Sequence, residues 1–383
     1  MRVMTTIKKV AILRPSALGD LVVALPALEA IRAAYPGAEI VYLGRPWHKK
    51  FFQERPLVDR VEVVPQYPGV GEDVSCVPDL RAVDDFFERM RGEAFDLALQ
   101  MYGGGEHSNP FLLMLEAKQT AGFCSRGAQP LDLVMPHVYL QNETVRCLEL
   151  TTLLGAKATT YSPRIRATPA EKREASLVYR QSRPFAIIHP GASDLRRRWH
   201  PEGFSRVADA LAARGLDVCI TGVEQEHAIA SAVTSGMNFP AENLAGKLSL
   251  GALIGLISNA SILVANDTGP LHLAHALQTP SVGLYAAGSV GPWAPLERTA
   301  NAVVVARTMD CPRCGMRFTL TEPMRARADC DHSFSFVRDI TEDAVIAAVD
   351  EMLQRGETAR APDEHDTMTE CTSAGIQKPQ KTR

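Results

Sequence analysis

Residues 262–272 of the chain read ILVANDTGPLH, an apolar run that passes directly into the expected start of a helix. The run from Ile262 to Ala265 has the length and β-branched character of a strand that is buried on both faces. Pro270 suits the first turn of a helix, because its missing N–H would have no partner there. A buried strand followed at once by a helix is typical of βα units around a parallel sheet.

Similar apolar runs recur along the 383 residues and are separated by stretches of helical length. In the first half the predicted strands are Val10 to Leu13, Ile40 to Leu43, Val61 to Val64 and Phe95 to Leu99. In the second half they are Phe185 to His189, Val218 to Thr221, Ile262 to Ala265, Ser281 to Tyr285 and Ala302 to Val305. The clearest helical face between them is formed by Leu80, Val83, Phe86, Phe87 and Met90. The alternation predicts an α/β fold of two halves, each built around a parallel sheet.

A polar stretch between about residues 156 and 184 separates the two halves. We expect an N-terminal domain over residues 1–165, a linker over 166–183, a C-terminal domain over 184–355 and a tail over 356–383. Within the linker, Thr168-Pro169-Ala170-Glu171 has the pattern of a capping box with proline at the first helical position, which predicts a short helix. The last 28 residues contain only six apolar ones, so the tail is predicted to be disordered.

The charge balance argues against some classes of function. With 41 Lys and Arg against 44 Asp and Glu, the formal charge is -3, and no broad basic field for nucleic acid is expected.

The first residues lack the uninterrupted apolar core of a secretory signal, which favours a cytoplasmic location. The uncharged stretch from Leu248 to Asn266 contains several Gly, Ser and Asn residues, and it is predicted as a buried helix, a turn and a strand rather than a membrane helix.

Two strand ends carry polar residues suited to ligand binding. The first strand leads into Arg14-Pro15-Ser16-Ala17-Leu18-Gly19-Asp20, where small residues admit a ligand to the backbone and a carboxylate stands at a helix start. The alternative is that Asp20 only caps the helix.

The strand ending at His189 leads into Pro190-Gly191-Ala192-Ser193 and then Arg196-Arg197-Arg198-Trp199. A hydroxyl and three guanidinium groups at a turn suit a phosphate or diphosphate, whereas a solvated basic turn beside a packed Trp199 is the alternative.

The third strand end is Asn266-Asp267-Thr268-Gly269-Pro270-Leu271-His272. Such a junction directs backbone N–H groups and the positive end of a helix toward an anion. Asp267 and Thr268 are suited to hold hydroxyls or phosphate oxygens, and a purely structural Asx-turn is the alternative. Neither half has Gly-x-Gly-x-x-Gly after its first strand, which argues against a dinucleotide oxidoreductase.

Together with Pro26 and Tyr35-Pro36, these three spaced motifs resemble glycosyltransferase family 9, the ADP-heptose:lipopolysaccharide heptosyltransferases and their relatives. The resemblance runs in order from about residue 8 to residue 355. It implies a GT-B fold, in which two Rossmann-like domains with parallel sheets face a central cleft. The acceptor would bind on the N-terminal side and the nucleotide sugar on the C-terminal side.

The resemblance also implies roles for single residues. Asp20 corresponds to the aspartate proposed as general base, and Ser16 and Gly19 would belong to an acceptor-side or backbone cradle. Arg197 stands where the family usually has a lysine, with Arg198 adjacent, and either arginine is a candidate for the diphosphate. The other expected donor-site residues are Ser193, Glu224 or Glu226 near the ribose, Asp267, Thr268, Gly269 and His272.

A separate cluster follows the last predicted strand. Cys311, Cys314, Cys330 and His332 have a spacing that suits a tetrahedral structural Zn or Fe site. Family members often carry a further cysteine here, but Phe336 occupies the place that we would align with it. Reduced thiols in a surface loop are the alternative.

The resulting hypothesis is an inverting, metal-independent glycosyltransferase that needs no cofactor for catalysis. It would move a sugar, most simply heptose from ADP-heptose, to a hydroxyl of a glycan acceptor such as lipopolysaccharide core. The alternatives are a family relative with another nucleotide sugar or acceptor, from capsule, glycoprotein or natural-product glycosylation, and a nucleotide-sugar-binding protein without catalysis. A lipid-linked acceptor would bring a cytoplasmic enzyme into peripheral contact with the inner membrane. Acceptor choice is expected to depend on loops such as Met101 to Phe111.

Overall fold

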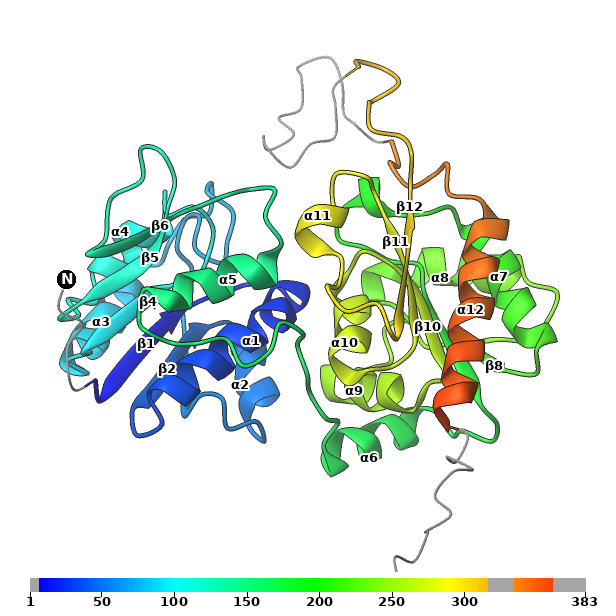
Figure 1. Ribbon diagram of the computed structural model, residues 1–383, viewed down its shortest axis with the longest axis horizontal. Helices are drawn as coiled ribbons and strands as arrows, with labels where there is room; N and C mark the ends of the chain where they lie inside the picture. The colour runs from blue at the N-terminus through cyan, green and yellow to red at the C-terminus, as the bar shows by residue number, and fades with distance from the viewer. Residues whose placement is uncertain (1–6, 316–333, 361–383) are drawn as a thin grey trace, which may run out of the picture.

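The chain folds into two α/β halves that lie side by side, each with one parallel six-stranded sheet (Figure 1). The computed structural model describes residues 7–315 and 334–360, with side chains described as far as residue 355. The strand order is β3-β2-β1-β4-β5-β6 in the first sheet and β12-β11-β10-β7-β8-β9 in the second. In both sheets the first strand of the half therefore lies between the second and the fourth. This is the order of a Rossmann sheet, whose ligand crevice lies where the strand order reverses.

The first half contains six strands and five helices among the described residues. Its strands are β1 (Lys9–Leu13), β2 (Glu39–Gly44), β3 (Arg60–Val63), β4 (Leu97–Gln100), β5 (Thr120–Cys124) and β6 (Leu133–Pro136). Its helices are α1 (Leu18–Ala34), α2 (Pro46–Phe52), α3 (Leu80–Gly92), α4 (Ser108–Leu113) and α5 (Glu143–Thr152).

The second half repeats this plan after the connecting helix α6 (Pro169–Val178). Its strands are β7 (Phe185–His189), β8 (Asp217–Ile220), β9 (Glu242–Asn243), β10 (Ile262–Asn266), β11 (Ser281–Tyr285) and β12 (Asn301–Val305). Its α-helices are α7 (Pro201–Ala213), α8 (His227–Ser235), α9 (Leu250–Asn259), α10 (Gly269–Leu277), α11 (Val290–Trp293) and α12 (Glu342–Arg360), with short 3₁₀ turns at Leu195–Arg197 and Glu224–Glu226.

Alternate residues of each strand pack on opposite faces of the sheet, so helices cover both faces. In β1, Val10 and Ile12 join the apolar cluster that contains α1, whereas Ala11 and Leu13 join the cluster that contains α3. In β10, Leu263 packs with α9 and α10 on one face. Burial on both faces explains why these strands appear in the sequence as continuous apolar runs.

The two-sheet α/β fold class is confirmed, as are the nine predicted strands. The sequence did not predict β5, β6 and β9. The residues of β5 read TAGFC and lack β-branched residues after Thr120, and β9 has two residues. Such segments carry no strand pattern of their own. They form because a neighbouring strand offers parallel hydrogen bonds.

The helix predicted in the linker is present as α6. Thr168 Oγ1 accepts a hydrogen bond from the Glu171 amide at 3.2 Å, and Glu171 Oε2 accepts one from the Thr168 amide at 2.8 Å. Helix α12 continues to Arg360, five residues beyond the domain end expected at residue 355. The rest of the expected tail, residues 361–383, lies outside the described part of the chain.

Candidate functional site

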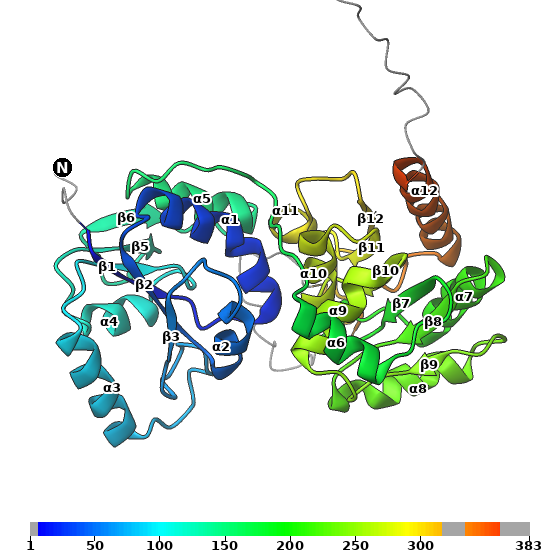
Figure 2. The same ribbon diagram turned by 90° about the horizontal axis from the view of Figure 1, so that it is seen from below.

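The start of α1 lies on the side of the first half that faces the second half (Figures 1 and 2), and its first turn carries Asp20. Ser16 is buried after the end of β1, and the Asp20 side chain is half-buried in the first turn of α1. The N-cap of α1 is Ala17, with no side-chain hydrogen bond, so Asp20 does not fill the capping position. Its carboxylate therefore stands at the positive end of a helix, where negative charge is stabilised.

The start of α10 forms the corresponding point of the second half. Thr268 is the N-cap and makes no side-chain capping bond, and Pro270 occupies the first turn. Asp267 is 1% exposed, and neither of its carboxylate oxygens has a hydrogen-bond partner. It therefore forms no Asx-turn. Oδ1 lies 3.4 Å from His272 Nε2, and Oδ2 lies 3.7 Å from Arg197 Nη1.

The structure separates the roles of the three consecutive arginines. Arg196 is held by Asp194 through hydrogen bonds of 2.6–3.0 Å. Arg197 donates to the Asp267 carbonyl at 3.3 Å. Arg198 donates to the Ala192 carbonyl at 2.8 Å and lies 3.8 Å from Glu226. Arg197 and Arg198 thus flank the turn after β7, and each keeps about a quarter of its side chain exposed.

Glu224 and Glu226, the two alternatives for the residue near the ribose, lie in different surroundings. Glu226 is 7% exposed and packs against Gly191, where the absence of a β-carbon makes room for the carboxylate. Its Oε2 accepts a hydrogen bond from the Val223 amide at 3.0 Å and lies 3.9 Å from His189 Nε2. Burial lowers the pKa of His189, and the Glu226 charge partly opposes that effect. Glu224 is exposed and lies against Gly246.

Trp199 and Ser193 differ sharply in burial. Trp199 is 1% exposed and donates from Nε1 to the Ile340 carbonyl at 3.0 Å. It is a packing residue of the second half. Ser193 is exposed on the turn after β7, where its hydroxyl is accessible.

Asn266 is the first residue of the motif at the end of β10, but it was not predicted as a site residue. It is fully buried, and its Nδ2 donates to the Pro190 carbonyl at 2.8 Å. Its Oδ1 accepts a hydrogen bond from the Trp199 amide at 3.1 Å. The side chain therefore ties the end of β10 to the turn after β7. Its position at a buried strand end, where a polar residue requires partners, was the available signal.

The starts of α1 and α10 are in contact across the boundary between the halves. A β-carbon built at Gly19 would lie 2.7 Å from His272 Cδ2, and one at Gly269 would lie 3.2 Å from Leu18 Cβ. The residue before Asp20 thus touches the imidazole that faces Asp267. This contact joins the carboxylate-bearing helix start of the first half to the predicted anion site of the second.

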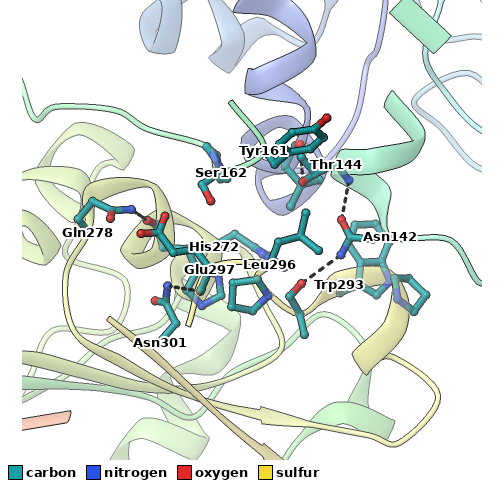
Figure 3. Close-up of a pocket in the computed structure, with 16 residues that line it drawn as sticks. Asn142, Thr144, Tyr161, Ser162, His272, Gln278, Trp293, Leu296, Glu297 and Asn301 are labelled. Atoms are coloured by element: carbon teal, nitrogen blue, oxygen red, sulfur yellow. Dashed lines mark hydrogen bonds between the residues drawn. The ribbon is translucent and has the colours of Figure 1, made fainter. Parts of the chain in front are cut away.

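A small pocket lies beside this contact (Figure 3). Figure 3 shows Asn142 and Thr144 of the first half opposite Trp293 and Leu296 of the second, with His272 in the wall. Asn142 Nδ2 donates to the Ala294 carbonyl at 3.1 Å and to the Gly291 carbonyl at 3.3 Å. The space of about 20 Å³ holds about one water molecule and is too small for a sugar. The residues around it therefore serve as contacts between the halves.

The expected metal cluster is described only in part. Cys311 is buried and Cys314 is half-buried, whereas Cys330 and His332 lie outside the described residues. Within residues 7–315 and 334–360, no three His, Cys, Asp or Glu side chains are grouped to hold a metal ion. The metal site stays a prediction. In the same part of the chain no helix has the length and apolar character to cross a bilayer.

The chain is similar in sequence to known proteins over most of its length. Residues 83–320 match the family described as glycosyltransferase family 9 (heptosyltransferase). The chain is 26% identical over 310 residues to the lipopolysaccharide core heptosyltransferase OpsX of Haemophilus influenzae, covering 78% of this chain and 84% of that protein. It is 24% identical over 377 residues to lipooligosaccharide heptosyltransferase 2 of Haemophilus ducreyi, covering 90% of this chain and 99% of that protein.

Solved structures have the same two-domain fold. A glycosyl transferase family 9 structure from Veillonella parvula superposes with a TM-score of 0.74 at 18% identity, covering 92% of this chain and 99% of that one. The E. coli heptosyltransferase WaaC, solved with ADP, gives 0.66 at 18% identity, covering 90% and 99%. The fold is therefore GT-B. With more than half of its length matched by the family, the chain belongs to glycosyltransferase family 9 and is a glycosyltransferase.

Proposed function

We propose that this enzyme transfers heptose from ADP-heptose to a hydroxyl of a lipopolysaccharide core glycan, with inversion at the anomeric carbon. The observation that carries the proposal is the contact between the starts of α1 and α10, in which Gly19, the residue before Asp20, lies against the His272 ring that faces the buried Asp267. The names of the two heptosyltransferase relatives and the ADP bound by WaaC support the choice of donor and acceptor.

The donor would bind to the second half, residues 184–355, at the carboxyl ends of β7 and β10. The N–H groups at the start of α10 and the guanidinium groups of Arg197 and Arg198 are suited to the diphosphate. Glu226, which packs against Gly191 of the turn after β7, is our candidate for the ribose hydroxyls, rather than the exposed Glu224. Ser193 supplies an exposed hydroxyl on the same turn.

The acceptor would bind to the first half, residues 1–165, beside Ser16 and Gly19. Asp20 takes the proton of the acceptor hydroxyl as that oxygen forms a bond to the anomeric carbon. The bond from this carbon to the diphosphate oxygen breaks, and the electron pair leaves with ADP. Arg197, Arg198 and the start of α10 then stabilise the charge that develops on the leaving group. Attack from the side opposite to the leaving group inverts the configuration.

We propose that the transfer needs no metal ion, because Arg197, Arg198 and the start of α10 would supply positive charge to the diphosphate. No Asp-x-Asp pair, a common metal clamp for nucleotide sugars, occurs in the three motif segments. Transfer is expected to continue in the presence of EDTA. Metal bound by the predicted cluster of Cys311, Cys314, Cys330 and His332 would be structural, and emission spectroscopy of the purified protein measures it.

We further propose a cytoplasmic location with peripheral contact at the inner membrane, where a lipid-linked acceptor is presented. Cosedimentation with vesicles that contain the lipid-linked acceptor tests this contact. Vesicles without that acceptor separate recognition of the glycan from general lipid binding.

The decisive experiment combines donor binding with transfer by the variant Asp20→Asn. Thermal shift with a panel of nucleotide sugars should single out ADP-heptose, because a ligand of the native state raises its stability. Asp20→Asn should keep the shift with ADP-heptose and lose at least about 100-fold in transfer rate, the usual contribution of a general base. Glu29→Gln, a half-buried carboxylate change further along α1, is the matched control and should keep activity.

Two outcomes would contradict the proposal. A shift with another nucleotide sugar but not with ADP-heptose would reassign the donor within the family. Full transfer by Asp20→Asn would remove this carboxylate as the base.

A further inference from the structure

A buried group of charges lies beneath the first turn of α1, and the proposed transfer gives it no role. It contains Arg14, Glu143 and Arg146, which are 2%, 5% and 9% exposed. Arg14 Nη2 lies 2.9 Å from Glu143 Oε1, and Arg146 pairs with Oε2 of the same carboxylate. Burying three charged side chains has a large desolvation cost, which their mutual attraction offsets only with good geometry.

Arg14 contacts three separate segments of the first half. Its Nε and Nη2 both donate to the Asp20 carbonyl oxygen, at 3.1 and 2.7 Å. Its Nη1 donates to the Met101 carbonyl, directly after β4. Through Nη2 it also reaches Glu143, the first residue of α5. One guanidinium group thus spans the crevice between β1 and β4, where the strand order of the sheet reverses.

Each of these segments lies where the acceptor half of the site is expected. The first carries Asp20 itself. The second continues from Met101 into Gly103 and Gly105, both with positive φ, and so begins the loop predicted to contact the acceptor. The third is the start of α5, where Asn142 donates to two carbonyls of the second half.

We propose that Arg14, held in place by Glu143, is a positioning residue for sugar transfer. It fixes the peptide group that carries Asp20 relative to the Met101 segment and the start of α5. The inference rests on the proposed function, since it assigns Asp20 the role of base. Arg14 itself touches neither donor nor acceptor in this assignment.

The chemistry of the contacts requires an arginine. Three acceptors lie around one planar group, and a guanidinium directs its N–H donors to them in a fixed fork. A lysine keeps the charge but carries one nitrogen on a flexible stem. Glu143 is equally specific, because it is the carboxylate that pairs with both buried arginines.

The test compares Arg14→Lys with Arg32→Lys in the full-length enzyme. Arg32 lies near the other end of α1, where it donates to the Ala38 carbonyl at 2.9 Å and pairs with Asp59. Arg14→Lys should lower kcat by about tenfold or more, since small misplacements of a reacting group cost up to about 100-fold. The KM for ADP-heptose and the Kd for ADP should stay within about twofold, because the donor half is unchanged. Arg32→Lys should keep both kcat and KM.

Glu143→Gln is the second variant, and calorimetry with ADP checks that each protein is folded. It should show the same loss of kcat with the same ADP affinity. Wild-type enzyme that transfers no sugar from ADP-heptose would refute the proposed function, independently of these variants. Active wild-type enzyme together with variants of unchanged kcat would overturn the positioning role. A parallel loss of kcat and ADP affinity would also overturn it, because that pattern indicates a general structural effect.

Discussion

Because Gly19 has no β-carbon, His272 of the other half can lie against the start of α1. At 2.7 Å such a carbon would overlap the imidazole ring, so the two helix starts would have to separate. Sequence reasoning assigned Gly19 to a cradle for ligand backbone contact, and the structure gives it a second use as a contact between the halves. The spacing between Asp20 and Asp267 therefore depends on a residue without a side chain.

Among the arginines, we expect Arg197→Ala to weaken ADP binding by about tenfold, or about 1.4 kcal/mol. The reason is that Arg197 is directed toward Asp267 and the start of α10, where a diphosphate is expected. Isothermal titration calorimetry with ADP measures the change.

Arg196→Ala is the matched control, because Asp194 already holds that guanidinium group. Its ADP affinity should match that of the wild type. Equal affinities for all three proteins would remove Arg197 from the phosphate site.

Sequence reasoning located the motif residues because each follows a recognisable strand. Arg14 and Asn266 stand within the motifs but were given no role, because their roles depend on partners that are distant in the sequence. Arg14 bonds to residues 87 and 129 positions away, and Asn266 bonds to residues 67 and 76 positions away. Such pairs form only when the sheet brings distant strand ends together, and no local pattern records them.

At the scale of elements, α6 shows how one local signal can serve two contacts. Glu171 completes the capping box of α6, and its carboxylate also pairs with Arg55 of the first half at 2.8 Å. The Glu171 carbonyl lies close to Gly255 of α9, where a β-carbon would not fit. The sequence predicted the cap because its residues are neighbours. It did not predict the ion pair, whose partner lies 116 positions away.

We expect Thr168→Ala to destabilise the enzyme by about 1 kcal/mol, because the first turn of α6 loses its side-chain acceptor. For a domain of this size, the melting temperature should fall by about 2–4 °C. Differential scanning calorimetry measures the shift.

Thr168→Ser keeps the hydroxyl and is the control, with an expected melting temperature close to that of the wild type. A melting temperature for Thr168→Ala equal to that of Thr168→Ser would show that the hydrogen bond to Glu171 contributes nothing measurable.

At the scale of the whole molecule, the two halves share one strand order, and a side chain spans the reversal point in each. Arg14 does so between β1 and the end of β4, and Asn266 does so between β10 and the turn after β7. The two α/β halves were predictable from apolar runs alone, since parallel strands are buried on both faces. How the halves face each other was not, because it depends on contacts such as that of Gly19 with His272.

Buried histidines give the enzyme a predictable response to acid. Burial lowers the pKa of His48 from 6.5 to about 3 and that of His137 to about 4. Below pH 6.5 these two histidines bind protons in the unfolded chain but stay neutral in the folded chain. Their protonation therefore does not reduce the free energy of unfolding above pH 6.5, and it lowers that free energy as the pH falls from 6.5 toward the folded pKa values. At pH 5, His48 alone should cost about 2 kcal/mol relative to pH 7.

Urea denaturation at pH 7 and pH 5 tests this response. His48→Asn should lose less stability between the two pH values than the wild type, by about 2 kcal/mol, because no proton binds to the amide. The amide oxygen is suited to accept the Arg45 N–H that His48 Nδ1 accepts at 2.7 Å. An unchanged pH dependence in His48→Asn would show that this ring does not set the acid response.

The contact between α1 and α10 also sets a condition for exchanging modules between related transferases. If the first half binds the acceptor and the second half the donor, as proposed, a chimera of the first half of this chain with the second half of a relative should combine the acceptor preference of one parent with the donor preference of the other. Its junction falls in the segment before α6, but Gly19 and His272 would then come from different parents. The starts of α1 and α10 can reach the same spacing in the hybrid only if one parent supplies a glycine and the other a ring of matching size. Compatibility of chimeras should therefore follow this pair of residues more closely than overall sequence identity.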